Sequence, residues 1–148
     1  MKPSTKNAKA RRGIDYLYFN IYSYFYRISQ YRQNFNVRIQ AMYLFSLGSG
    51  GWLLLLESLY LHGIKHSRFS SPAESMLFAV SLYALTALLF YYIFIVKDRD
   101  LKIYGKYEEL AAENPKRKWH LFLSLGVLVL PYLVLLSFAF FAPRHGQL

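Results

Sequence analysis

The stretch AMYLFSLGSGGWLLLLESLYLH, residues 41–62, is an apolar run of 22 residues with one charged side chain, Glu57. A helix of that length rises about 33 Å, at about 1.5 Å per residue, and the hydrocarbon core of a bilayer is about 30 Å thick. The run therefore predicts a transmembrane helix over residues 41–62.

Two more apolar runs, residues 75–96 and 119–142, contain no Asp, Glu, Lys or Arg. The sequence Ser71-Pro-Ala-Glu74 in front of the first of them is the pattern of a capping box with Pro at the first helical position. We therefore expect the second helix to begin there and to run over 71–96, and a third to span 119–142.

Pro131 lies in the middle of the third run. Proline has no backbone N–H, so Pro131 cannot donate to the carbonyl of Val127 one turn earlier. The sequence predicts a kink at this position.

The composition agrees with these spans. The chain of 148 residues is 55% hydrophobic, and the three runs hold nearly half of it. This predicts an all-α integral membrane protein with three transmembrane helices. The sequence has no cysteine, which excludes disulfides and thiolate chemistry.

The basic residues predict an orientation. Residues 1–40 contain eight Lys and Arg, the segment between the first two spans two, residues 97–118 seven, and the segment after the third span one. Because cytoplasmic segments are enriched in Lys and Arg, we expect the N-terminus and the 97–118 loop in the cytoplasm and the C-terminus outside. Residues 1–13 and 143–148 are predicted to be tails, the first of them basic and disordered.

Residues 14–40 carry nine aromatic side chains, six of them Tyr. Apolar residues such as Leu17 and Ile21 recur at helical spacing, and Asn20, Ser23 and Arg27 fall opposite them. This pattern predicts an amphipathic helix at the membrane interface, its rings among acyl chains. A strand is the alternative, since Tyr alternates between residues 16 and 26.

Basic side chains in the N-terminal region are candidates for contact with anionic lipid head groups or another anionic ligand. They are Arg11, Arg12, Arg27, Arg32 and Arg38. Stacking of the Tyr and Arg side chains on a nucleotide or nucleic acid is the alternative. We do not expect it, because an aromatic belt belongs beside a membrane span in any case.

Small residues in two spans predict close helix packing. They are Ser46, Gly48, Gly50 and Gly51 in the first span and Ser81, Ala84 and Ala87 in the second. Small residues let helix backbones approach one another in lipid, so we expect self-association or a membrane-protein partner.

Glu57 is the only ionisable acid inside a span, which makes it a functional candidate. Its position near the outer boundary predicts a side chain that snorkels to the interface or pairs with Lys65, His66 or Arg68. Burial in a helix interface is the alternative.

The 97–118 segment is predicted to be a partly helical loop on the membrane surface. Its acids, Asp98 and Asp100 among them, alternate with Lys and Arg and are expected to be solvated. The sequence contains no nucleophile elbow, phosphate loop or set of metal ligands, so we expect no enzyme activity, cofactor or metal.

The IYSYFYR run before the first span, with a charged loop after the second and a short tail, resembles uncharacterised small three-span inner-membrane proteins of Bacteroidota. The resemblance implies a bacterial inner-membrane protein and no particular activity. Two functions remain open: a self-associating membrane effector of the bacterial defence type, gated by a ligand or partner, and an accessory or scaffolding subunit of a larger envelope complex.

Overall fold

The computed structural model describes residues 13–32, 35–65, 71–112 and 116–141, and these are helical with no strand. The helices are α2 (Ile14–Ser29), α3 (Val37–Tyr60), α4 (Pro72–Phe90), α5 (Arg99–Ala112) and α6 (Arg117–Phe141), and π-helical turns η1 (Leu61–Lys65) and η2 (Tyr91–Val96) continue α3 and α4. The alternative of a strand in the aromatic region is therefore wrong. The predicted tails lie outside the described residues, except for Gly13.

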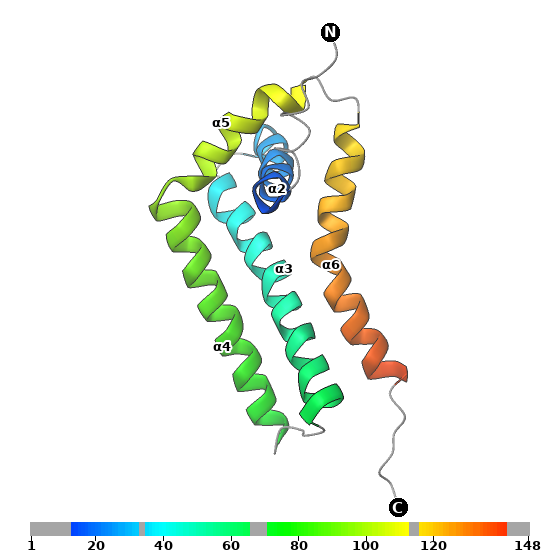
Figure 1. The fold of residues 1–148 in the computed structure, drawn as a ribbon. Helices are drawn as coiled ribbons and strands as arrows, with labels where there is room; N and C mark the ends of the chain where they lie inside the picture. Colours follow the sequence, from blue (N-terminus) through cyan, green and yellow to red (C-terminus); the bar gives the residue numbers. More distant parts are fainter. Residues whose placement is uncertain (1–12, 33–34, 66–70, 113–115, 142–148) are drawn as a thin grey trace, which may run out of the picture.

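Three helical segments are long and apolar enough to cross a membrane: Val37–Ile64, Pro72–Val96 and Arg117–Phe138. This confirms an all-α protein with three candidate transmembrane helices. Helix α3 lies in the middle and packs against both α4 and α6, which flank it on its two sides (Figure 1).

The helix ends follow local capping chemistry. Ser71 Oγ accepts a hydrogen bond of 3.2 Å from the Glu74 backbone N–H, and Pro72 is the first residue of α4, as predicted. The Asn36 side chain caps α3 in the same way, accepting from the Ile39 N–H at 3.3 Å. The prediction of one helix over 14–40 is wrong, because Asn36 starts a new helix after α2 has ended at Ser29.

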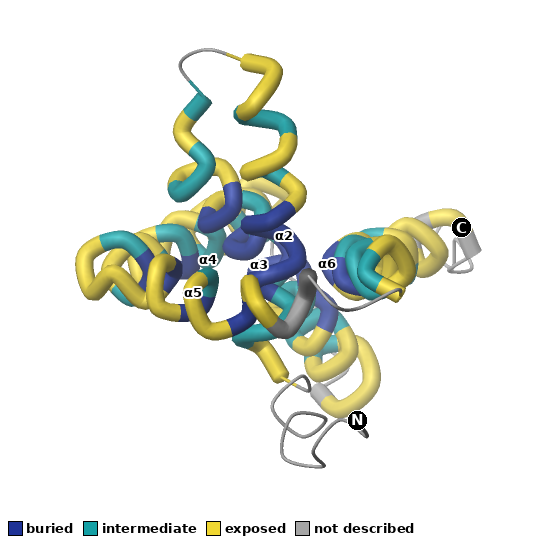
Figure 2. The backbone as a smooth tube through the Cα atoms, turned by 90° about the horizontal axis from the view of Figure 1, so that it is seen from above, coloured by how far each residue is buried: buried dark blue, intermediate teal, exposed yellow. Residues whose placement is uncertain are grey.

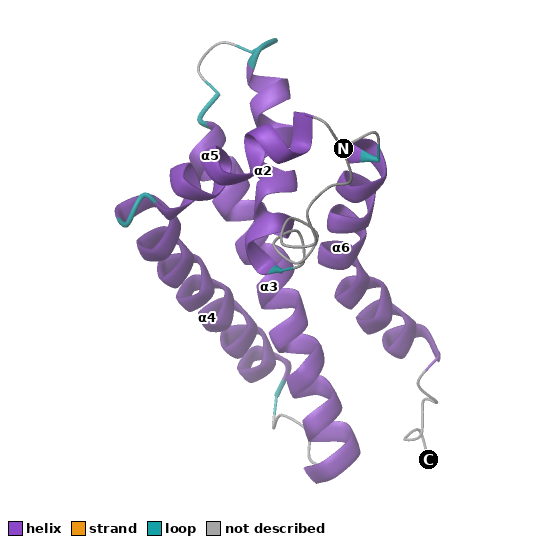
Figure 3. Ribbon diagram, turned by 45° about the horizontal axis from the view of Figure 1, so that its top comes forward, coloured by secondary structure: helices purple, strands orange, loops and turns teal. Residues whose placement is uncertain are grey.

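Helices α2 and α5 form a layer, here called the cap, over the ends of the spans (Figures 1 and 3). Helix α2 contacts α3, α5 and α6. Its buried residues lie around the whole helix and include Tyr18, Ile21, Asn20 and Ser23. Asn20 and Ser23 of the predicted polar face are thus covered by protein while Arg27 is exposed, and the apolar face packs on helices where acyl chains were expected.

Burial falls sharply away from the cap. Within their most apolar windows, 44% of the residues are buried in the first span, 11% in the second and 17% in the third. Figure 2 shows the buried backbone gathered around α2 and α3, with the outer sides of α4 and α6 exposed. In a bilayer these outer sides would face lipid or a partner.

Candidate functional site

An aromatic cluster joins α2 to the adjoining ends of α3 and α4. The Tyr18 ring stacks on Phe94, with centroids 4.0 Å apart and planes 5° apart, and meets the edge of Phe45 at 5.4 Å. Phe90 contacts both Phe45 and Phe94, at 5.1 and 5.6 Å. Aromatic pairs of this kind contribute about 0.5–1.5 kcal/mol each beyond simple burial, so α2 is firmly coupled to two spans.

A second group of rings joins α2 to α5. Tyr104 packs against Phe19, Tyr22 and Tyr26, with centroids 5.0–5.8 Å apart, and Tyr107 packs against Tyr16 and Phe19. Tyr107 and Ile103 are buried, 3% and 4% exposed. The segment predicted as a partly helical loop on the membrane surface does contain a helix, α5, but the apolar side of this helix packs on α2.

Three tyrosines of the cap, Tyr18, Tyr22 and Tyr104, have a raised pKa. Burial raises the pKa of Tyr18 far above its usual range, and the nearby Asp100 carboxylate raises it further. Burial and then Asp100 also raise the pKa of Tyr22, while burial and Glu108 raise the pKa of Tyr104 to about 12. The Tyr18 hydroxyl is buried and has no hydrogen-bond partner among the described residues.

Arg38, at the start of α3, binds two aspartates at the start of α5. Its Nε and Nη2 donate to the two carboxylate oxygens of Asp100 at 2.6 and 2.9 Å, and Nη2 also donates to Asp98 at 2.6 Å and to the Ile95 carbonyl at 3.1 Å. Asp100 is fully buried. A bidentate pair of this kind fixes both distance and orientation, so it locks α5 onto the first span.

This contact corrects two predictions. Arg38 was expected to contact lipid or an anionic ligand, yet it is engaged by carboxylates of its own chain. Asp100 was expected to be solvated, yet its side chain has 0% exposure. Asp98 has a positive φ of 47°, a conformation costly for a non-glycine residue, at the tight turn that brings both acids to Arg38.

Polar contacts join α2 to α6 and α5. Asn20 Nδ2 donates to Ser124 Oγ at 2.9 Å, and the Tyr16 hydroxyl and His120 Nδ1 share a hydrogen bond of 2.8 Å. On the other side Arg99 donates to Asp15 at 2.9 Å. Together with the rings, these contacts connect α2 to all three spans.

The glycines of α3 lie where the flanking helices come closest. A Cβ on Gly48 would lie 2.8 Å from Leu128 Cβ of α6, and one on Gly51 would lie 2.8 Å from the Tyr132 ring. On Gly50 it would lie 2.6 Å from the Tyr83 ring of α4. The predicted packing residues of the first span, buried Ser46 included, therefore act within the chain.

Two tyrosines meet at these glycines, and sequence reasoning missed both. The hydroxyls of Tyr83 and Tyr132 lie 2.7 Å apart, and the Tyr132 hydroxyl donates to the Leu47 carbonyl at 2.7 Å. The sequence does contain a signal for this contact. Each tyrosine lies at the centre of an apolar run, and a phenol at that depth needs a hydrogen-bond partner.

Pro131 is fully buried inside α6, which changes direction along its length (Figure 1). The Val127 carbonyl, which proline cannot satisfy, accepts a hydrogen bond of 2.9 Å from Trp52 Nε1 of α3. The helix interruption thus doubles as a contact between spans.

Two of the small residues of α4, Ser81 and Ala84, are exposed, while Ala87 is half-buried and Thr86 is buried. Ser81 and Ala84 therefore lie away from the side of α4 that Tyr83 and Thr86 turn toward the chain. Their use by another molecule stays a prediction.

The remaining predicted sites are dispersed. Glu57 is half-buried, and no ion pair of its side chain is formed among the described residues. Of its predicted partners, His66 and Arg68 lie outside those residues, as do Arg11 and Arg12. Arg32 is exposed after α2, and Arg27 lines a hollow between α2 and α6.

No group of three or more His, Asp or Glu side chains that could hold a metal ion occurs within the described part of the chain. Comparison of the sequence and structure with protein-family models, curated proteins and solved structures finds no match. The contacts described above connect the helical cap to every span.

Proposed function

We propose that this chain is a non-enzymatic bacterial inner-membrane protein that self-associates through its spans and responds to a ligand or partner at the cap. The observation that carries the proposal is the position of α2. Tyr18 contacts α3 and η2 through Phe45 and Phe94, and Asn20 contacts α6 through Ser124. A displacement of α2 would therefore act on three spans at once.

The orientation follows from charge. Lys and Arg are concentrated in residues 1–40 and 97–118, the sequence ranges that contain α2 and α5. Under the positive-inside rule the cap lies in the cytoplasm and the C-terminus outside, where a cytoplasmic ligand would reach α2 first. A reporter fused after Leu148 is expected to be active outside the cytoplasm, and a cytoplasmic signal would contradict this topology.

Self-association is supported by the side of α4 that the rest of the chain leaves exposed. Helix α4 contacts the chain mainly along one side, and Ser81 and Ala84 are exposed on it. Small exposed residues on an apolar helix allow the backbone of a second copy to come close.

The test is the size and activity of the full chain in nanodiscs and vesicles. In nanodiscs we expect particles larger than one copy. In vesicles we expect the contents to leak when a ligand or partner at the cap activates the protein. Ser81→Leu with Ala84→Leu should reduce the assembly, while Ser137→Leu on exposed α6 should not. A uniform monomer that leaves vesicles sealed would contradict the proposal.

The alternative is an accessory subunit of a larger envelope complex. It is supported by an open apolar groove of about 470 Å³ between α3 and α4, lined by Trp52, Leu85, Leu89 and Phe90 among others. Copurification of one membrane protein in fixed stoichiometry, with no homo-oligomer, would favour this function.

A further inference from the structure

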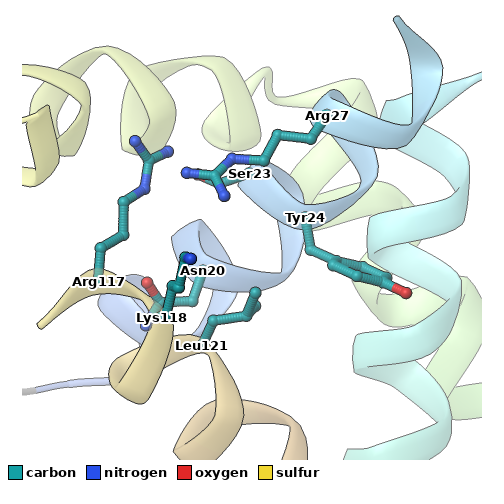
Figure 4. Close-up of a pocket in the computed structure, with 7 residues that line it drawn as sticks. All are labelled: Asn20, Ser23, Tyr24, Arg27, Arg117, Lys118 and Leu121. Carbon is teal, nitrogen blue, oxygen red and sulfur yellow. The ribbon is translucent and has the colours of Figure 1, made fainter. Parts of the chain in front are cut away.

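We infer that the hollow between α2 and the start of α6 binds a phosphate group. Arg27 of α2 and Arg117 and Lys118 of α6 line it, together with Asn20, Ser23, Tyr24 and Leu121. Figure 4 shows the guanidinium groups of Arg27 and Arg117 extending into the same space, although the two residues come from different helices.

Within the described residues, no ion pair balances the charge of the hollow. None of Arg27, Arg117 and Lys118 forms an ion pair within the described residues. Like charges that converge are unfavourable unless an anion lies between them, and a guanidinium matches two phosphate oxygens at once. The arrangement therefore suits a phosphate better than a single carboxylate.

The floor of the hollow carries a second, independent observation. Ser23 is 6% exposed, and its hydroxyl is buried without a hydrogen-bond partner in the part of the chain that the structure describes. A buried hydroxyl is normally paired, so an unpaired one that lines a cationic hollow marks a ligand contact. The Asn20 side chain beside it is held in place by its hydrogen bond to Ser124 and forms part of the wall of the hollow.

The size and position of the hollow favour a lipid as the source of the phosphate. Its cavity volume is about 10 Å³, about that of one water molecule, so a phosphate would rest at the mouth and direct one oxygen toward Ser23. Arg117 and Lys118 directly precede Trp119, which is 59% exposed at the start of the third span. Tryptophan in this position marks the level of the lipid head groups.

The inference uses the proposed membrane position of α6 and does not depend on self-association. A variant that loses phosphate binding but keeps the oligomer size of the wild type would separate the two.

The test measures lipid retained by the full chain in detergent, by native mass spectrometry, with phosphatidylglycerol as the anionic probe and phosphatidylcholine as the zwitterionic one. We expect retention of phosphatidylglycerol, reduced about tenfold or more by Arg27→Gln with Arg117→Gln. The matched control, Lys97→Gln with Lys102→Gln, removes the same charge at exposed positions outside the hollow and should change retention less than about twofold.

Two further arms complete the design. Ser23→Ala should weaken retention without loss of helicity, and Arg27→Lys with Arg117→Lys should fall between wild type and the Gln variant, because the charge stays and the planar fork is lost. If inorganic phosphate protects the wild type and not the Gln variant, the site stands and its ligand is soluble. Equal loss in the matched control, or no preference for phosphatidylglycerol, would overturn the inference.

Discussion

The two ends of the three spans are stabilised in different ways. At the cap end the spans are held by protein: stacked rings around Tyr18 and the buried pair of Arg38 with Asp100. At the opposite end Leu56, Met76 and Leu136 are 60%, 70% and 53% exposed. The fold is therefore specified within the chain at one end, while the other end depends on lipid or another protein.

The largest effect is expected from breaking the ion pair at the cap. Arg38→Met would leave Asp100 buried without its partner and should cost about 3 kcal/mol of unfolding free energy, measured by denaturant titration in mixed micelles. Asp100→Asn in the same chain should recover part of the loss, because the uncompensated charge is removed. Arg32→Met, at an exposed cation, should change the stability by less than about 0.5 kcal/mol. Equal effects of the two Arg variants would refute the clamp.

The next largest effect is expected in the middle of the spans, between the cap end and the opposite end. Gly48→Ala would place a methyl group against Leu128 and should cost about 1–3 kcal/mol. Gly126→Ala in α6 meets nothing within 4 Å and should be neutral or stabilising, since Ala favours a helix. Thermal unfolding of the two variants in the same detergent compares their stabilities. A loss of stability in Gly126→Ala with none in Gly48→Ala would contradict the packing described above.

A smaller effect is expected at Pro131. Trp52→Phe leaves the Val127 carbonyl without its donor and should cost about 1 kcal/mol. In a Pro131→Ala background the backbone N–H returns to that carbonyl, so the same Trp52→Phe change should cost less. A double-mutant cycle on unfolding free energies measures the difference. Additive effects would mean that the two residues act independently.

The smallest effect should have the opposite sign. Tyr18→Phe removes a buried hydroxyl that has no partner within the described ranges, so at neutral pH stability should be unchanged or rise by up to about 1 kcal/mol. Tyr31→Phe, at an 88% exposed phenol, is the matched control. A clear loss in Tyr18→Phe would reveal a hydrogen bond of the Tyr18 hydroxyl.

Alkaline pH sharpens the same contrast. Because the folded cap raises the pKa of Tyr18, Tyr22 and Tyr104, its stabilisation is complete below about pH 10, the usual pKa of tyrosine, and declines above it. For Tyr104 the decline continues through its folded pKa of about 12. Circular dichroism of the wild type between pH 9 and about 12 should show this loss, and Tyr104→Phe should make it shallower. A stability that does not fall above about pH 10 would contradict the raised values.

The sequence predicted the three spans correctly, but it did not predict that protein rather than lipid covers the helices of the cap. Hydropathy and the Ser71 cap are local signals, and both predicted their helices correctly. The periodicity of residues 14–29 shows which side chains avoid water but not whether lipid or protein covers them, so α2 was placed on the membrane surface.

Contacts between distant residues were out of reach for a different reason. Arg38 and Asp100 are 62 positions apart. Asp100 has Lys97, Arg99 and Lys102 beside it in the sequence, which offer simpler pairings, while no Asp or Glu lies between residues 16 and 56 to suggest a partner for Arg38. The small residues illustrate the same limit, since glycines in α3 and small residues in α4 look alike as patterns. Only the first set meets bulky partners, Leu128, Tyr83 and Tyr132, within the chain.

The bond from Trp52 to the Val127 carbonyl also bears on the order in which the protein assembles. Helix α3 is made and inserted before α6, and a lone α6 in lipid would carry an unpaired carbonyl one turn before Pro131. An isolated third helix is therefore less stable in lipid than one docked on α3, where the Val127 carbonyl has its hydrogen-bond donor. Insertion and docking of the last helix should be nearly simultaneous, and the proline helps to ensure that the finished chain does not remain as separate helices.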